Sequence, residues 1–459
     1  MDQILGLVSG KTFNDESWNT RTTRRKIFHT YPQGNFPLTG LLSMAETDVA
    51  DSPKFGWQEK DRVEPETTIA EKGGGGAPIC DTTTETPKAS PTTIAAGDLF
   101  RLQVADKSIF QAKHTVYVES LPTSTGIVDL LCIVVSVVSA YEAIEVRALE
   151  PAAAILNTTN LITGGTAGPI GAQVSIIGNA NAEGGSSGDS GIFLPPYEVE
   201  NYTQIFKNPF SATGTAIKVP TDYDKSGAYR EIAQDNATEH MTLIEKAFWF
   251  GPKTLEYVVE DSETVPLRTT GGVEHFLKEY EKAAAVYRGA SSAALTLNTE
   301  EDKRIIRPTA GALTTTFFEQ DLMERLFRMA SSGEKLCVCG SGFLGAVNAA
   351  IKAGLTENKG MKSETVYGMN VTVWETPFGT VYFKTHPLFN NSAFRRYDAF
   401  FLDMGHIKYR PLKDRDTKRY KNRQANNQDR RKDEWLTEAG LEFRHPQAHM
   451  LIKNCRSFT

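Results

Sequence analysis

A long stripe of apolar residues predicts one dominant helix near the middle of this chain. Apolar side chains recur at three- and four-residue spacings from Tyr229 to Phe248, which is the periodicity of one helix face. Gly251-Pro252 should end the helix sharply. A helix of about six turns exceeds the ordinary ~11–12 residues, so we expect a structural spine. The residues expected on its core face are Tyr229, Ile232, Met241, Ile244 and Phe248.

Short alternating runs before this helix predict a separate β module. Apolar and polar residues alternate in Phe100–Val104 and again in Ile144–Ala148. Alternation with a period of two is typical of half-buried antiparallel strands. A Gly/Pro-rich stretch starting at Gly73–Gly76 precedes these runs, and a Gly/Ser-rich stretch, Gly184–Gly191, follows them. Linker composition on both sides predicts a module over residues 93–178, inserted into another fold.

The part of the chain after the spine helix predicts an α/β segment followed by further strands. A capping box at Thr316–Glu319 should start a second helix that ends near Gly333. The next expected elements are a strand at Leu336–Cys339, a helix at Phe343–Ala353, a hairpin at 371–383, and strands at Ala399–Leu402, Leu441–Phe443 and Ala448–Ile452.

The composition is that of a globular protein with unevenly distributed charge. A chain of 459 residues with 40% hydrophobic residues can hold about two or three domains with their own cores. The net charge is −6, but residues 401–459 carry fourteen Lys/Arg against eight Asp/Glu, so this segment is +6 and residues 1–400 are −12. The basic segment therefore indicates a face with a partner of its own.

The cysteines and the hydropathy indicate a reducing compartment and no membrane partner. Five cysteines at irregular spacing do not predict a disulfide framework. The first residues, Met1–Gln3, lack the layout of a signal peptide. The longest apolar run, Ile127–Val138, is interrupted by Asp129 and is shorter than the ~20 residues of a spanning helix. Its Val and Ile content favours a buried strand.

One glycine motif could indicate a nucleotide site. Gly340–Gly345 matches GxGxxG and lies between a predicted strand and a predicted helix. However, Glu375 lies 30 residues beyond Gly345 rather than the ~20 of dinucleotide-binding folds. We favour a tight turn whose glycines permit close packing, and we expect no cofactor. A dinucleotide-binding oxidoreductase stays a less favoured alternative.

The possible metal ligands do not form a recognisable site. Cys337 and Cys339 are separated by one residue, and no second cysteine pair accompanies them. On a strand, both side chains would point to the same face, as two small buried groups. His445 and His449 are four residues apart, but Pro446 prevents the helix that would bring them together. We expect no metal.

No set of residues indicates catalysis either. Gly188–Gly191 resembles the nucleophile loop of chymotrypsin-like proteases, with Ser190 as the nucleophile. Those enzymes also need a histidine and a buried aspartate, and neither His29 nor His114 has a suitable context. We therefore expect no catalytic residues.

A strongly basic segment, Arg410–Lys432, has ten Lys/Arg in 23 residues and almost no apolar side chains. It could be a solvated loop, a nonspecific contact to phosphate, or a contact to an acidic neighbour. The sequence does not decide between these partners. The residues assigned to this basic loop are Arg410, Lys413, Arg415, Lys418, Arg419, Arg430, Arg431 and Lys432.

The segment Phe36–Arg62 begins apolar, becomes acidic and reaches an aromatic tip at Phe55-Gly56-Trp57. Aromatic residues at the end of a polar arm would lack neighbours to pack on. Burying one of them is worth roughly 1.5–3 kcal/mol. We therefore expect a second copy of the chain to cover Phe55 and Trp57, with Glu59 in the same inter-subunit contact.

The order of these pieces, together with several short segments, resembles the major capsid (major head) proteins of tailed bacteriophages, which have the Hong-Kong-97-like fold. The segments that carry the resemblance are Phe55–Glu59, Ile176–Ala180, Asn201–Phe206, Ile244–Phe248 and Leu441–His449.

The resemblance implies an α+β capsid fold with a small inserted antiparallel β domain. In that family a projecting E-loop reaches over a neighbour, a P-domain with the spine helix builds the shell wall, and an A-domain lies at the capsomer centre. The implied divisions are an N-terminal arm at 1–35, the first half of the E-loop with a Gly/Pro linker at 36–92, the inserted domain at 93–178, the E-loop return at 179–225, the P-domain at 226–330, the A-domain at 331–389, and the C-terminal P-domain strands with the basic loop at 390–459.

By the same resemblance, the expected function is self-assembly into an icosahedral shell around a double-stranded DNA phage genome, without enzymatic activity. The expected partners are other copies in hexamers and pentamers, a scaffolding protein, a portal and, nonspecifically, the packaged DNA. The expected location is the virion, after assembly and procapsid maturation in the host cytoplasm. A protein nanocompartment shell of the same fold and an oxidoreductase that uses Gly340–Gly345 are the alternatives.

Overall fold

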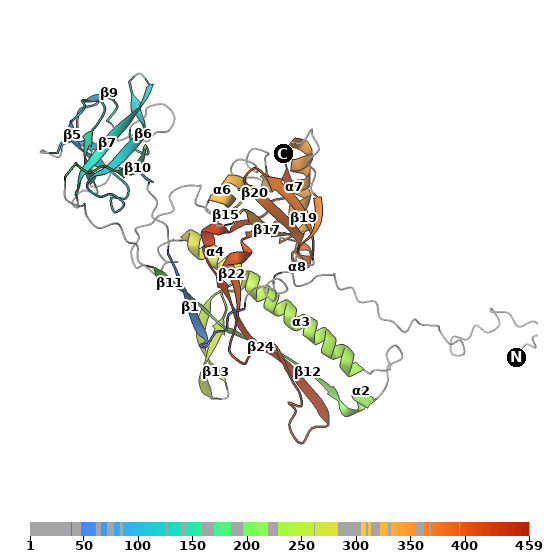
Figure 1. Ribbon diagram of the computed structural model, residues 1–459. Coiled ribbons are helices and arrows are strands. Elements are labelled where there is room, and N and C mark those ends of the chain that lie inside the picture. Colours follow the sequence, from blue (N-terminus) through green and yellow to red (C-terminus); the bar gives the residue numbers. More distant parts are fainter. Residues whose placement is uncertain are drawn as a thin grey trace, which may run out of the picture. The chain divides into compact units, whose positions relative to one another are not determined.

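The computed structural model describes residue 38 and most of residues 47–458, and it divides into two compact units (Figure 1). One unit comprises Met1–Glu59 and Tyr197–Thr459, and the other is Lys60–Pro196. The stretches between residues 47 and 458 that it does not describe are 61–65, 71–77, 83–85, 125, 139–142, 158–168, 185–195, 219–227, 261, 283–303, 309–310, 314–321, 329–331, 355–361, 367–368 and 394. The predicted arm at 1–35, Gly73–Gly76, Ser190 and the capping box at Thr316–Glu319 therefore lie outside the described residues.

The unit Lys60–Pro196 is built on one nine-stranded sheet, with the main order β2-β10-β6-β7-β8-β5-β3 and with β4 and β9 paired beside it. The alternating apolar residues form its core, in which Phe100, Val116 and Ile144 are fully buried. The strands are β2 (Glu66–Thr68), β3 (Ile79–Cys80), β4 (Thr92–Ile94), β5 (Leu99–Gln103), β6 (His114–Thr123), β7 (Gly126–Val138), β8 (Ala143–Ala148), β9 (Ala152–Ile155) and β10 (Gln173–Asn179).

The predicted start of this module at residue 93 is too late. Strand β2 pairs with β10, and β3 pairs with β5, so segments assigned to a linker belong to the sheet. Asn157 fixes the β3 end, because its side chain accepts from the Ile79 amide at 3.1 Å and donates to the Ile79 carbonyl at 2.8 Å. Two- and three-residue strands give too short an alternation to detect in the sequence.

The other unit contains a seven-stranded sheet with the order β15-β25-β21-β17-β20-β19-β18. Strand β17 is parallel to β20 and antiparallel to β21. Strands β21 and β25 come from the part of the chain assigned to a different subdomain, so the predicted division at residue 390 does not separate the sheets. The bounds are β15 (Ile305–Ile306), β17 (Glu334–Cys339), β18 (Lys362–Val366), β19 (Met369–Thr376), β20 (Gly379–Thr385), β21 (Ala399–Leu402) and β25 (Met450–Ile452), with α7 (Ser341–Gly354) after β17.

A second sheet of four strands carries the long helix. It has the order β12-β24-β22, with β23 also paired to β24, and α3 packs against β12 and β24 (Figure 1). The strands are β12 (Gln204–Thr213), β22 (Ile407–Pro411), β23 (Lys418–Tyr420) and β24 (Arg430–Phe443). About a third of the segment predicted as a basic loop, including Lys418–Tyr420 and Arg430–Lys432, is therefore strand.

Three two-stranded pairs complete this unit. They are β1 (Lys54–Glu59) with β11 (Tyr197–Tyr202), β13 (Thr254–Glu260) with β14 (Glu263–Thr269), and β16 (Ala312–Leu313) with β26 (Ser457–Phe458). The remaining helices are α2 (Gly214–Lys218), α4 (Val273–Lys282), α6 (Met323–Arg328), α8 (Pro387–Asn390), and the 3₁₀ turns η4 (Arg395–Tyr397), η5 (Met404–His406) and η6 (Pro446–Ala448).

The spine helix is confirmed as α3 (Ala228–Phe250), but its buried face differs from the prediction. Ile244 and Phe248 are in the core as expected, whereas Tyr229 is only half-buried. Ile232 and Met241 are 38% and 36% exposed. The strands under the first half of α3 present polar groups there, so His240 is buried in their place, 2.7 Å from Asn208 Oδ1 and 2.8 Å from Thr437 Oγ1. An apolar stripe could not reveal a buried polar face.

Candidate functional site

The aromatic tip predicted to face a second subunit is covered by the chain's own core. Phe55 and Trp57 are 9% and 7% exposed and lie on β1. The ring of Phe55 packs so closely on Gly440 that a Cβ there would lie 2.6 Å from it. Trp57 meets the ring of Phe276 edge-on, with centroids 5.9 Å apart. The expectation that these residues lack neighbours was wrong, because strand β24 and helix α4, both distant in sequence, supply them.

Glu59 is buried within the larger unit, and its carboxylate accepts three hydrogen bonds. Its side chain accepts hydrogen bonds from Trp57 Nε1 at 2.7 Å, the Tyr197 hydroxyl at 3.1 Å and the His445 amide at 3.1 Å. Glu59 is the last residue before the unit Lys60–Pro196, and Tyr197 is the first residue after it. The predicted inter-subunit residue Glu59 is thus an internal anchor of the chain.

A second buried carboxylate, Glu245, ties two distant segments to the spine helix and also binds Trp249 of the same helix. Its Oε1 accepts from the Leu38 amide at 3.0 Å, Trp249 Nε1 at 3.0 Å and His386 Nε2 at 2.9 Å. His386 Nδ1 in turn accepts from the Leu388 amide at 3.1 Å, so Nε2 carries the proton. The apolar stripe of the sequence gave no signal of this network, because one charged residue in a helix usually faces solvent.

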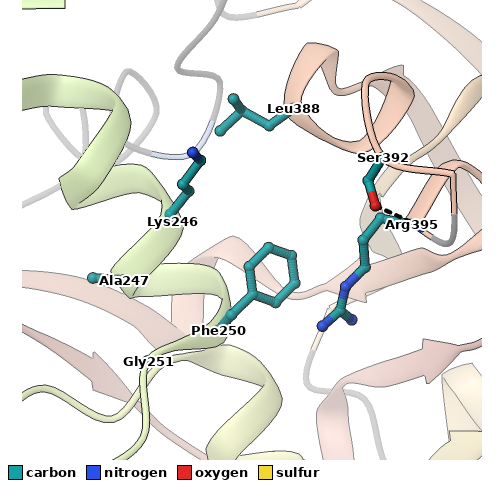
Figure 2. Close-up of a pocket in the computed structure, with 7 residues that line it drawn as sticks. All are labelled: Lys246, Ala247, Phe250, Gly251, Leu388, Ser392 and Arg395. Carbon is teal, nitrogen blue, oxygen red and sulfur yellow. Dashed lines mark hydrogen bonds between the residues drawn. The ribbon is translucent and has the colours of Figure 1, made fainter. Parts of the chain in front are cut away.

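A cavity with a volume of about 390 Å³ lies beside the same helix (Figure 2). Its wall includes the guanidinium of Arg395, which lies 4.1 Å from the ring centroid of Phe250 and pairs with Glu274 at 2.9 Å. Burial alone would raise the pKa of Glu274, but hydrogen bonds from Lys278 and Lys453 and the charge of Arg395 lower it to about 2. The lining residues are Lys246, Ala247, Phe250, Gly251, Leu388, Ser392 and Arg395.

The glycine turn Gly340–Gly345 is filled by protein. A Cβ at Gly340 would lie 2.3 Å from the Arg396 carbonyl oxygen, and one at Gly342 would lie 2.6 Å from the ring of Tyr397. The Ser341 amide, at the start of α7, donates to Asn390 Oδ1 at 2.7 Å. Gly340 and Gly342 therefore serve close packing against η4, and a side chain already occupies the donor that a phosphate would use.

The cysteines and histidines do not form a metal site in the part of the chain that is described, where no three metal-binding side chains converge. All five cysteines are buried, and none of them forms a disulfide. His449 is fully buried, accepts from the Asp403 amide at 3.0 Å and donates to the Arg444 carbonyl at 3.1 Å. Burial, with the nearby Lys335 charge, lowers its pKa to about 3. Among the described helices, none has the length and apolar character to cross a membrane.

The basic segment divides into paired and unpaired cations. Arg410 pairs with buried Glu442, Arg415 pairs with Glu438 at 2.6 Å, and both Arg419 and Arg431 reach Asp433, at 2.8 and 3.3 Å. Arg410 and Arg419 thereby join neighbouring strands to β24, Arg415 joins a turn to it, and Arg431 pairs within β24 itself. Lys413, Lys418, Arg430 and Lys432 have no carboxylate partner among the described residues, although Lys418 Nζ donates to the Asp414 carbonyl and Arg430 to Gln428.

One hairpin, β13–β14, leaves a row of apolar side chains uncovered. Leu255, Tyr257 and Val259 are 40%, 69% and 73% exposed, and they point to the same face of β13. At its base, Thr254 and Thr269 are hydrogen-bonded through their side chains at 2.6 Å, and Thr269 donates to the Pro252 carbonyl. An isolated two-stranded hairpin is marginal in water, so this surface is suited to a partner.

The comparison with protein families decides the class of this chain. The model of the SU10 major capsid protein matches residues 10–456, which is nearly the whole sequence. The chain belongs to the SU10 major capsid protein family. It is thus a phage major capsid protein and a virion component, which confirms the resemblance seen in the sequence.

Individual relatives of this capsid protein are distant in sequence. It is 21% identical over 422 residues to the major capsid protein of Pseudomonas phage PaMx41, covering 90% of this chain and 83% of the relative. Among solved structures, it is similar to the capsid of cyanophage A-1(L), at 9% identity with a TM-score of 0.39 over 61% of this chain and 85% of the other. It is also similar to the SrpI encapsulin of Synechococcus elongatus, at 8% identity with a TM-score of 0.37 over 57% and 76%.

The family match also ranks the alternatives. A phage capsid protein is a structural protein, which agrees with the filled glycine turn, so the oxidoreductase alternative has no support. The encapsulin likeness gives the nanocompartment alternative no advantage over a phage capsid, because the match along nearly the whole sequence is to a phage family.

Proposed function

We propose that this capsid protein assembles with copies of itself, as hexamers and pentamers, into an icosahedral shell that encloses double-stranded DNA. The observation that carries the proposal is the uncovered apolar face of β13–β14, where Tyr257 and Val259 are the most exposed large side chains of the hairpin. Removing apolar surface from water stabilises an interface by about 25 cal/mol of free energy per Å² buried. Repeated over many subunits, such contacts stabilise a closed shell.

The proposal assigns the family's subdomains to the two units as follows. The β1–β11 pair is the root of the E-loop, and the unit Lys60–Pro196 is inserted between its strands. Helix α3 with the β12–β24 sheet corresponds to the P-domain. The seven-stranded sheet with α7 corresponds to the A-domain, and it takes β21 and β25 from the end of the chain. Four-stranded and seven-stranded sheets in one unit support two subdomains that share a core.

The other proposed partners are a scaffolding protein, a portal and the packaged DNA, with assembly in the host cytoplasm. Self-association is supported by the uncovered hairpin, whereas nonspecific contact with DNA is proposed from the family alone. The four paired arginines are not assigned to DNA contact because each is bound to a buried carboxylate of the subunit.

Electron microscopy and sedimentation of the full chain, expressed alone and with its neighbouring phage genes, test the proposal. Uniform shells or ring-shaped capsomers are expected, and shells isolated from infected cells should contain nuclease-protected DNA. Shells filled with protein cargo and free of DNA would favour the nanocompartment. Monomers under every condition would contradict shell assembly altogether.

A further inference from the structure

The β13–β14 hairpin carries three glutamates that no cation of the described residues neutralises. The hairpin sequence, residues 254–269, contains Glu256, Glu260, Asp261 and Glu263 but only one basic residue, Arg268. The guanidinium of Arg268 pairs instead with Glu438 on β24, at 3.7 Å. In the described chain no cation lies within ion-pair distance of the three glutamates, all of which are exposed. We call residues 254–269 the acidic hairpin.

The register of the acidic hairpin makes this charge unfavourable in the isolated subunit. Glu260 and Glu263 are directly opposite each other in the antiparallel pair. Like charges in directly opposed positions destabilise a strand pair. A cation from outside would relieve this repulsion, whereas a neutral or anionic partner would not. The apolar residues of the other face, Leu255, Tyr257 and Val259, would be buried in the same event.

A complementary surface exists at the far end of the four-stranded sheet. Residues 418–432, which we call the basic turn, contain seven Lys/Arg and one Asp. Three of its exposed cations, Lys421, Arg423 and Arg430, have no carboxylate within ion-pair distance in the described structure. Arg423 is held over the ring of Tyr420 at 4.7 Å, and Arg430 is fixed by Gln428 at 2.7 Å.

Both surfaces are carried on extended strands that leave the body of the unit. Figure 1 shows the β13 hairpin and the ends of β12 and β24 extending away from the sheet that carries α7. Arg419 and Arg431, clamped on buried Asp433, fix the basic turn to its sheet. The turn is therefore presented as a preformed cationic surface, which lowers the entropy lost when it binds.

We propose that the acidic hairpin of one copy docks on the basic turn of a neighbouring copy. The inference rests on the proposed shell assembly and names the contact that joins two subunits. The partner is a second copy of this chain because the two surfaces carry opposite charges. If DNA bound the basic turn instead, the repulsion between Glu260 and Glu263 would remain. The contact joins two different surfaces, so it is heterologous and can propagate around a closed ring. The charges align the two subunits, and the apolar row Leu255, Tyr257 and Val259 is buried in the contact.

Charge reversal tests the proposal directly. One variant carries Glu256→Lys, Glu260→Lys and Glu263→Lys, a second carries Lys421→Glu, Arg423→Glu and Arg430→Glu, and a third combines all six. A matched control reverses three exposed glutamates elsewhere, with Glu150→Lys, Glu334→Lys and Glu375→Lys. Shell yield is measured by sedimentation and electron microscopy, and circular dichroism with thermal unfolding of the unassembled chain establishes that each variant folds.

The first two variants are expected to lower shell yield about tenfold or more, and the combined variant to recover it to within about threefold, because complementarity is restored. The matched control should stay close to wild type. Unchanged shell yields in the first two variants would overturn the docking. A combined variant that folds but forms no shells would overturn it too. Normal shells from the second variant that have lost only their DNA would assign the basic turn to DNA instead. If the wild-type chain forms no shells, shell assembly itself fails and the docking fails with it.

Discussion

The Tyr197 hydroxyl donates a hydrogen bond to Glu59 Oε2 at 3.1 Å, and these two residues are the points at which the chain leaves and re-enters the larger unit. They are also directly opposite each other at the end of the β1–β11 pair. An entire nine-stranded unit is thus inserted across one strand pair that is closed by a buried carboxylate.

Replacing Glu59 should therefore weaken the larger unit strongly. Glu59→Ala would leave Trp57 Nε1, the Tyr197 hydroxyl and the His445 amide without this acceptor. We expect the free energy of unfolding to fall by about 3 kcal/mol, since buried unsatisfied donors cost about 1–3 kcal/mol each. Urea unfolding of the unassembled chain measures this. Tyr197→Phe removes one bond only and should cost about 1 kcal/mol; equal losses in the two variants would contradict the anchor role.

The buried Glu245 should control the attachment of the segment at Leu38. In Glu245→Ala, the Leu38 amide loses its acceptor, so its hydrogen exchange should accelerate about tenfold or more, since 1.4 kcal/mol corresponds to a factor of ten. Mass spectrometry of peptides that contain Leu38 follows the exchange. Lys246→Ala, on the exposed neighbouring position, is the control and should leave the exchange unchanged. Equal protection in Glu245→Ala would mean that other contacts hold this segment.

Much of the fold is local enough to be predicted from the sequence. The end of α3 at Phe250 follows from Gly251-Pro252, and β17, α7 and the β19–β20 pair lie within a few residues of their predicted positions. Their signals are periodicity and turn chemistry, which act over a few residues. The family could be recognised for a related reason, because several short segments kept their order along the chain.

The partners of the side chains could not be predicted in the same way. Phe55 looked exposed because Gly440, its neighbour in space, is hundreds of residues distant in sequence. Ile232 looked buried because a stripe gives the apolar side of a helix but not the chemistry of the strands beneath it. The acidic hairpin was missed too. Its signal was an alternating apolar run interrupted by glutamates, and its importance depends on the register of Glu260 with Glu263.

The buried His449 should make stability fall as the solution becomes mildly acidic. Its pKa is lowered to about 3 in the folded protein, mainly by burial, against ~6.5 in the unfolded chain. The unfolded chain therefore binds more protons below pH ~6.5, and stability is lost on going down from that pH toward 3, by up to about 1.4 kcal/mol per pH unit. Chemical unfolding between pH 7.5 and 5 measures this slope.

In His449→Gln the slope between pH 6.5 and 5 should become flatter, even if stability at pH 7.5 is lower. His275→Gln is the control, because His275 lies on α4 beside Glu279 and is not fully buried. If the pH slope were unchanged in His449→Gln and reduced in His275→Gln, the prediction that His449 causes the pH dependence would be wrong.

The paired and unpaired cations of the basic segment should behave differently in the isolated subunit. Arg419 makes two hydrogen bonds to Asp433, at 2.8 and 3.2 Å, and its guanidinium lies 5.2 Å from the ring centroid of Phe210. Arg419→Ala should lower the free energy of unfolding by about 1.5–3 kcal/mol, the usual range for hydrogen bonds to charged groups. Lys421→Ala should change it by less than about 0.5 kcal/mol. Urea unfolding measures both free energies. Similar losses in Arg419→Ala and Lys421→Ala would contradict the division into paired and unpaired cations.

Two glycines of the same turn should respond to alanine with opposite signs. In Gly342→Ala, the new Cβ would lie 2.6 Å from the ring of Tyr397, so the turn against η4 must open. A Cβ at Gly345 has no heavy atom within 4 Å, and alanine is favoured over glycine inside a helix by about 1 kcal/mol. We therefore expect Gly342→Ala to lower the thermal midpoint of the unassembled chain and Gly345→Ala to raise it or leave it unchanged. If both lowered it equally, a role for the whole GxGxxG motif would be indicated. Opposite signs would show that each glycine is set by the space beside it, as expected for a packed turn of a capsid subunit.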